Sequence, residues 1–158
     1  FSIRLQEEKR MQFNSIYIIK MTKSLYHTEI INDEGLNGTV SVSDGESLQT
    51  SDPMKDLAGF NPEQLFGLSW ATCLNATIEA LLKARKAEAR SKAEVHVDFC
   101  REEDGKGFYF DLKAFISVEG MELADVEKLA QSAHKRCPVS KIIGDYNHVT
   151  LEVVPYAE

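Results

Sequence analysis

The stretch NPEQLFGLSWATCLNATIEALLKAR, from Asn61 to Arg85, decides the fold. Asn61 can cap a helix, Pro62 is tolerated at the first helical position, and Gln64 stands three residues after Asn61, as in a capping box. These signals predict a helix from Pro62 to about Glu88. Its first part is apolar on nearly every face, so other structure must enclose it. One domain of this size offers few strands for that purpose, and we therefore expect a homodimer.

The residues before this helix favour short strands. A hairpin is predicted from residues 24–31 and 39–42, because residues 32–35 have the composition of a turn and residues 39–42 alternate β-branched side chains. A further turn at 43–45 precedes a third short strand, predicted over 46–50.

The residues after the helix predict a second hairpin, a second helix and a closing strand. Apolar and polar side chains alternate over 95–99 and 108–118. Apolar residues at spacings of three and four predict a helix from about 122 to 136, and Pro138 marks a stop or a sharp bend. A last strand is predicted over 149–154. The order β-β-β-α-β-β-α-β is that of an α+β fold with antiparallel sheets.

Composition limits the class of protein. With 158 residues, 43% hydrophobic and 27% charged, the chain has the make-up of a single globular domain. The net charge of −7 argues against nucleic acid as a partner, and no apolar run approaches the length of a membrane span. Three cysteines, Cys73, Cys100 and Cys137, lie far apart and do not form an extracellular disulfide pattern, so we expect a cytoplasmic protein.

The first twenty residues are interpreted separately. Met21, Thr22 and Lys23 read like a translation start. We therefore expect residues 1–20 to be an N-terminal extension, either non-native or an extra strand or arm, and residues 21–158 to form a single domain. No cleavage site follows the short apolar patch in the extension, so a signal peptide is not predicted.

Two interpretations of Cys73 and Cys137 follow from the residues alone. Both cysteines lie on apolar parts of predicted helices, where free cysteines usually act as small core side chains. They could instead be a redox pair, in which one thiolate is oxidised to a sulfenic acid and the other thiol condenses with it. Only tertiary contact could pair them, because 64 positions separate them.

Three motifs, taken together and in order, give the chain a family resemblance. They are Gly38-Thr39-Val40-Ser41 with Ser43-Asp44-Gly45, then Asn61-Pro62-Glu63-Gln64-Leu65-Phe66 with Ala71-Thr72-Cys73, and finally Ala133-His134-Lys135-Arg136-Cys137-Pro138-Val139-Ser140. From about Lys23 to Val154 the sequence resembles the superfamily of osmotically inducible protein C and the organic hydroperoxide resistance proteins (OsmC/Ohr).

The resemblance implies a fold, an activity and a site. It implies an intertwined homodimer in which antiparallel sheets wrap two central helices. It also implies a cofactor-free thiol peroxidase that reduces organic hydroperoxides to alcohols and is recycled by a lipoyl-type dithiol. Cys73 would be the peroxidatic cysteine, Cys137 the resolving cysteine, and Glu63 the carboxylate that helps to position an arginine against the reactive sulfur.

The chain departs from the family at that arginine. Its place falls at or near Gly35, and residues 32–37 contain no basic side chain. A peroxidatic thiol needs a cation or hydrogen-bond donors to ionise, so a substitute would have to come from Arg136, His27 or the extension.

Other functions remain open at this stage. The main alternative is a non-peroxidatic OsmC-like protein that binds or senses an apolar small molecule, and a weaker one is a hydrolase-like thiol activity. Cys100 matches no motif and is interpreted as structural or incidental. His27, His96, His134 and His148 are scattered, so no metal site is predicted.

Overall fold

The computed structural model describes residues 24–157 and has the predicted α+β order, with two additional short helices, a 3-10 helix and α4. The 3-10 helix Gly35–Asn37 follows the first strand. The remaining elements are β1 (Ile30–Ile31), β2 (Thr39–Val42), β3 (Ser47–Gln49), α2 (Pro62–Ala84), β4 (Ser91–Arg101), β5 (Phe108–Val118), α3 (Leu123–Arg136), α4 (Pro138–Ile142) and β6 (Val149–Val153). The predicted extension, residues 1–20, lies outside the described residues.

Helix α2 begins where the sequence predicts. The Gln64 N–H donates to Asn61 Oδ1 at 2.8 Å, and the Asn61 N–H donates to Gln64 Oε1 at 3.0 Å, which completes the capping box. The helix ends at Ala84, earlier than the predicted Glu88.

The early end of α2 is a Schellman motif. The Ala87 N–H donates to the Leu82 carbonyl and the Lys86 N–H to the Lys83 carbonyl, both at 3.0 Å. Lys86 takes the left-handed conformation with φ 56°. Because a lysine stands where glycine usually marks this motif, the sequence pattern predicts a helix that is too long.

Strands β4, β5 and β6 form one sheet. β4 and β5 are antiparallel, and their inward residues pair across the strands, among them Val95 with Ala114 and Val97 with Leu112. β6 pairs with the other edge of β5 in parallel, with Leu112 opposite Val149. The predicted hairpins are antiparallel, whereas this closing strand is parallel to β5, because α3 and α4 form a crossover that returns the chain to the same end of the sheet.

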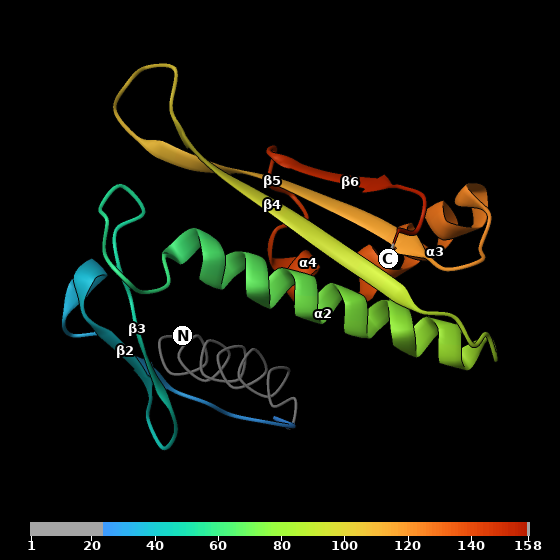
Figure 1. Ribbon diagram of the computed structural model, residues 1–158, viewed down its shortest axis with the longest axis horizontal. Coiled ribbons are helices and arrows are strands. Elements are labelled where there is room, and N and C mark those ends of the chain that lie inside the picture. The colour runs from blue at the N-terminus through green and yellow to red at the C-terminus, as the bar shows by residue number, and fades with distance from the viewer. Residues whose placement is uncertain (1–23, 158) are drawn as a thin grey trace, which may run out of the picture.

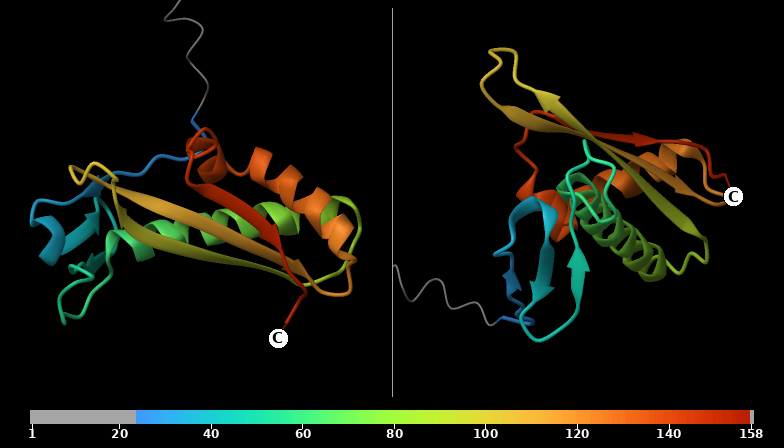
Figure 2. Two further views of the ribbon diagram at one scale, coloured as in Figure 1. Left: turned by 90° about the horizontal axis from the view of Figure 1, so that it is seen from above. Right: turned by 60° about the vertical axis from the view of Figure 1, so that its left-hand side comes forward.

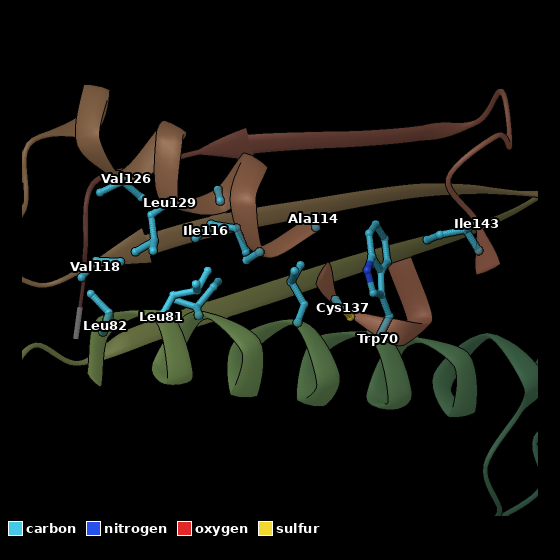
Figure 3. Close-up of a cluster of buried hydrophobic side chains, with 14 of the residues drawn as sticks. Trp70, Leu81, Leu82, Ala114, Ile116, Val118, Val126, Leu129, Cys137 and Ile143 are labelled. Atoms are coloured by element: carbon cyan, nitrogen blue, oxygen red, sulfur yellow. The ribbon is translucent and has the colours of Figure 1, made fainter. Parts of the chain in front are cut away.

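Both long helices cover the same face of this sheet. Figure 2 shows α2 along β4 and α3 along β5 and β6, side by side beneath the strands. The core between them consists mainly of fully buried side chains, shown in part in Figure 3: Trp70, Leu74, Ile78, Leu112, Ala114, Ile116, Val126, Leu129, Ala130, Ala133 and Cys137. Cys137 belongs to this core and Cys73 packs against it, so both candidate cysteines lie where the helices meet.

A second sheet is formed by β1, β2 and β3 in antiparallel order. It is set to one side of the start of α2, away from the larger sheet (Figure 1). Its apolar side chains are largely uncovered within the described chain: Ile30 is 59% exposed, Ile31 50%, Val42 38% and Leu48 37%. The first strand covers only two residues of the predicted range 24–31.

By length and composition alone, helix α2 is long and apolar enough to cross a membrane. The sequence does not suggest such a span, because it contains no long uninterrupted apolar run. Its polar capping box and the packing of Trp70, Leu74 and Ile78 against the sheet are instead the features of a core helix.

Candidate active site

Cys73 lies in the middle of α2. Its neighbour Leu74 is fully buried in the core, whereas the Cys73 side chain is only partly buried. The Thr77 hydroxyl, one turn further along the helix, donates to the Cys73 carbonyl at 2.8 Å. Cys73 is therefore the more accessible of the two candidate thiols.

Cys137 lies at the junction of α3 and α4. Its N–H donates to the Ala133 carbonyl at 2.8 Å and ends α3, while its extended ψ of 123° turns the chain into α4. Pro138, which was predicted to mark a stop or bend, occupies the first position of α4, where proline is tolerated. It therefore follows the end of one helix and begins the next. The Cys137 side chain is fully buried.

The fold brings the two sulfurs together. Cys73 Sγ and Cys137 Sγ are 3.2 Å apart, although 64 positions separate the residues in the chain. A disulfide bond is about 2.05 Å long, so a closure of roughly 1.2 Å would join them. The pairing that the resemblance implies is thus geometrically available.

The surroundings of the two sulfurs favour ionisation of Cys137 over Cys73. Burial raises the pKa of Cys73, the hydrogen bond and charge of Cys137 raise it further, and together they outweigh the lowering contribution of the Val139 N–H. Burial also acts to raise the pKa of Cys137, but hydrogen bonds from the backbone and hydroxyl of Ser140 and from Cys73 outweigh it, so this pKa is lowered.

Ser140 and Trp70 belong to the site and were not predicted as site residues. The Ser140 N–H donates to Cys137 Sγ at 3.5 Å, and the Trp70 indole N–H donates to Ser140 Oγ at 3.0 Å. Figure 3 shows Trp70 next to Cys137 above α2. The sequence signal that could have pointed to this contact is a tryptophan within an apolar helix, because a buried indole N–H needs a hydrogen-bond acceptor.

His134 and Arg136 precede Cys137 on α3. The His134 ring contacts Trp70, with ring centroids 6.4 Å apart, and its Nδ1 is buried without a hydrogen-bond partner among the described residues. Burial lowers the pKa of His134. Arg136 is exposed, and no cation contributes to the pKa of Cys73 within residues 24–157.

Glu63 does not lie beside Cys73 along α2. Ten positions on one continuous helix correspond to roughly 15 Å along its axis. Its carboxylate borders an open cleft of about 590 Å³, lined by apolar groups of α2 and β4 that include Leu68, Val95 and Val97. Glu63 Oε2 is buried and has no partner in the described part of the chain, so the role predicted for it stays a prediction.

The other candidate residues lie away from the thiols. His27 is exposed and contacts Glu29 at 3.2 Å. Cys100 is opposite Tyr109 on the face of the sheet that points away from the helices. Gly35 is exposed, with φ 73° in the turn before β2. Within residues 24–157, no three His, Cys, Asp or Glu side chains gather to hold a metal ion.

The chain is thus an α+β domain with two thiols in contact where its helices meet. The chain belongs to the OsmC-like protein family, whose model matches residues 54–152. It is 30% identical over 139 residues to the organic hydroperoxide resistance protein-like 2 of Staphylococcus epidermidis, covering 84% of this chain and 98% of the relative.

Other relatives agree with this assignment. The organic hydroperoxide resistance protein OhrB of Bacillus subtilis is 25% identical, with 82% of this chain and 98% of the relative covered. A solved structure from Legionella pneumophila, of an organic hydroperoxide resistance protein OsmC, is 26% identical with a TM-score of 0.75, covering 85% of this chain and all of that one (100%). A structure from Lactobacillus casei is 35% identical with a TM-score of 0.80, covering 88% and 97% of the two chains.

Proposed function

We propose that the protein is a cysteine-based peroxidase that reduces organic hydroperoxides to alcohols. The observation that carries this proposal is the 3.2 Å distance between Cys73 Sγ and Cys137 Sγ. Cys73, the more accessible thiol, attacks the distal oxygen of the peroxide and becomes a sulfenic acid, and Cys137 condenses with it. An external dithiol of the lipoyl type then reduces the disulfide and releases both thiols.

The surroundings support an organic substrate. Phe66 lies about two helical turns before Cys73 and packs against the buried core beside Trp70, with ring centroids 6.2 Å apart. Apolar side chains also dominate the cleft at the start of α2. Such surfaces favour an alkyl or aryl group over water, and therefore favour an organic peroxide over hydrogen peroxide.

The test is turnover of cumene hydroperoxide or a fatty-acid hydroperoxide with a dihydrolipoyl reductant. Cys73→Ser should abolish peroxide consumption, while the matched variant Cys100→Ser should keep it, because Cys100 lies on the opposite face of the sheet. Consumption unchanged by Cys73→Ser would contradict the proposal.

A second function is favoured by one observation. The described chain places no cation against Cys73, and burial raises its pKa. An OsmC-like protein that binds an apolar small molecule while its thiols stay reduced fits this environment. Alkylation of the reduced chain at neutral pH distinguishes the two: rapid, peroxide-competed modification of Cys73 supports the peroxidase, and a rate no faster than that of a model thiol supports the binding protein.

We also propose that the protein is a homodimer. The exposed apolar side chains of β1–β3, and Leu68 of α2 at 53% exposure, are the surfaces that a second copy would cover. Such a partner would also complete the enclosure that the apolar sequence of α2 requires.

A further inference from the structure

An open cleft lies between the start of α2 and strand β4. Its volume is about 590 Å³, which is in the range of small-molecule sites. Its walls are largely apolar, with Gly67, Leu68 and Ala71 on α2 and Val95 and Val97 on β4. The two valines also pack against the buried core, so this wall is a fixed part of the sheet. The cleft therefore has the size and the surface to hold a small organic group.

The cleft is separate from the pair of thiols. Neither Cys73 nor Cys137 is among the described residues that line it. Ala71, which does line it, precedes Cys73 by two positions, and two positions in an α-helix turn a side chain by about 200°. Cys137 lies at the junction of α3 and α4, whereas the cleft is lined by α2, β4 and the loop before α2. What the cleft binds is therefore independent of the thiol chemistry.

One carboxylate borders this apolar cleft. Glu63 Oε2 is buried and has no hydrogen-bond partner within residues 24–157. The neighbouring polar side chains are already used, because Asn61 and Gln64 complete the capping box with each other. The helix dipole favours a negative charge in the first turn of α2, but it gives Oε2 no hydrogen bond. An ionised carboxylate in such a place is costly unless a cation or a donor meets it.

The residues around the cleft provide no cation for Glu63. Glu63 is the sole charged side chain among the described residues that line the cleft. Residues 32–37, where the family resemblance places an arginine, contain no basic side chain. His96 of β4 lies on the outer face of the sheet, 2.8 Å from Glu94. The cleft therefore combines one negative group with apolar walls.

We propose that this cleft binds a small organic cation, a protonated amine with an alkyl or aryl group, whose ammonium meets Glu63 Oε2. An ammonium is a compact charge with three donors, which suits a buried carboxylate oxygen. The hydrocarbon part would lie against Gly67, Ala71, Val95 and Val97. Glu63 would repel a carboxylate that has the same hydrocarbon part, so the site selects its ligand by the sign of the charge.

Isothermal titration with phenethylamine at neutral pH tests the proposal without any peroxide. The amine should bind the parent chain at one site per chain. Hydrocinnamate, which has a similar hydrocarbon part and the opposite charge, should bind at least about tenfold more weakly. Equal binding of the two ligands would overturn the proposal. A parent chain that binds no phenethylamine would also overturn it, and this result is expected if a basic side chain of a second copy already meets Glu63.

Glu63→Gln tests the role of the charge. This variant keeps the size of the side chain and should weaken phenethylamine binding at least about tenfold, as expected on loss of a hydrogen bond between charged groups. Glu122→Gln is the matched control, because Glu122 is an exposed carboxylate that also stands at the start of a helix, and it should leave binding unchanged. Phenethylamine binding unchanged by Glu63→Gln contradicts the role given to Glu63.

Gly67 tests the place of binding. A Cβ on Gly67 would lie 3.5 Å from Val97 Cγ2, which is an ordinary van der Waals contact, so a side chain there fits between α2 and β4. Gly67→Leu should fill the cleft and abolish phenethylamine binding, whereas the smaller Gly67→Ala should keep it. Urea unfolding of both variants shows that the chains are folded. Binding retained by a folded Gly67→Leu chain would place the amine outside the cleft and overturn the proposal.

Discussion

At the residue scale, the chemistry depends on contacts that are remote in sequence. The two cysteines could be selected as candidates from the residues, and their pairing followed from family resemblance, because 64 positions separate them. The contact between Trp70 and Ser140 could not be predicted in this way, since it joins residues 70 positions apart. Apolar periodicity explains why Trp70 is buried, but it does not show which acceptor its indole meets.

His134 gives a prediction for the dependence of stability on pH. Burial lowers its pKa from the ordinary value of 6.5, so below about that pH the unfolded chain binds a proton that the folded chain does not. This contribution to the free energy of unfolding is complete above the unfolded pKa and is lost as the pH falls through the folded one. Between pH 8 and pH 5, the free energy of unfolding measured in urea should therefore fall less for His134→Gln than for the parent chain.

The matched control for this prediction is His96→Gln. His96 lies on the outer face of β4, exposed to solvent and 2.8 Å from Glu94. This variant should keep most of the acid-induced loss of stability of the parent chain, because an exposed ion pair contributes little to the free energy of unfolding. Identical pH profiles for His134→Gln and the parent chain would show that burial of His134 does not contribute to acid sensitivity.

At the element scale, side-chain signals predicted where elements begin better than where they end. The capping box of α2 is readable because it needs particular residues at Asn61 and Gln64. Its end depends on the backbone of Lys86, a residue type that carries no such signal. The start of β4 also cannot be predicted from apolar alternation, because its first inward residues are Ser91 and Ala93 rather than large apolar side chains.

The end of α2 gives a prediction for stability. A side chain in the left-handed region costs about 1–2 kcal/mol, and glycine avoids this cost while losing more backbone entropy on folding. Lys86→Gly should therefore raise the free energy of unfolding by about 0.5–1 kcal/mol. Lys86→Ala removes the same charge but keeps Cβ, so it should give no such gain. Equal effects of the two variants in urea unfolding would rule out a conformational origin.

At the scale of the whole molecule, residues 24–157 leave the two sheets unequally covered. The sheet of β4–β6 packs against both long helices, whereas the sheet of β1–β3 exposes apolar side chains such as Ile30 and Ile31 (Figure 1). The order of elements and the fold class were predictable, because local periodicity and turns determine them. Periodicity does not show what covers the apolar side chains of the small sheet, because it describes only which residues of one element share a face.

The proposed homodimer gives the last prediction. Leu68 on α2 is 53% exposed, and it borders the apolar cleft between α2 and β4. A charge introduced there would be buried by a second copy, so Leu68→Glu should shift the chain from dimer toward monomer, with at least a tenfold weaker association in sedimentation equilibrium. Leu123→Glu, at the start of α3 and 45% exposed, changes an equally exposed leucine away from this cleft and should leave the dimer intact. A parent chain that sediments as a monomer contradicts the prediction directly, and equal weakening by both variants would show that the association does not use this side of α2.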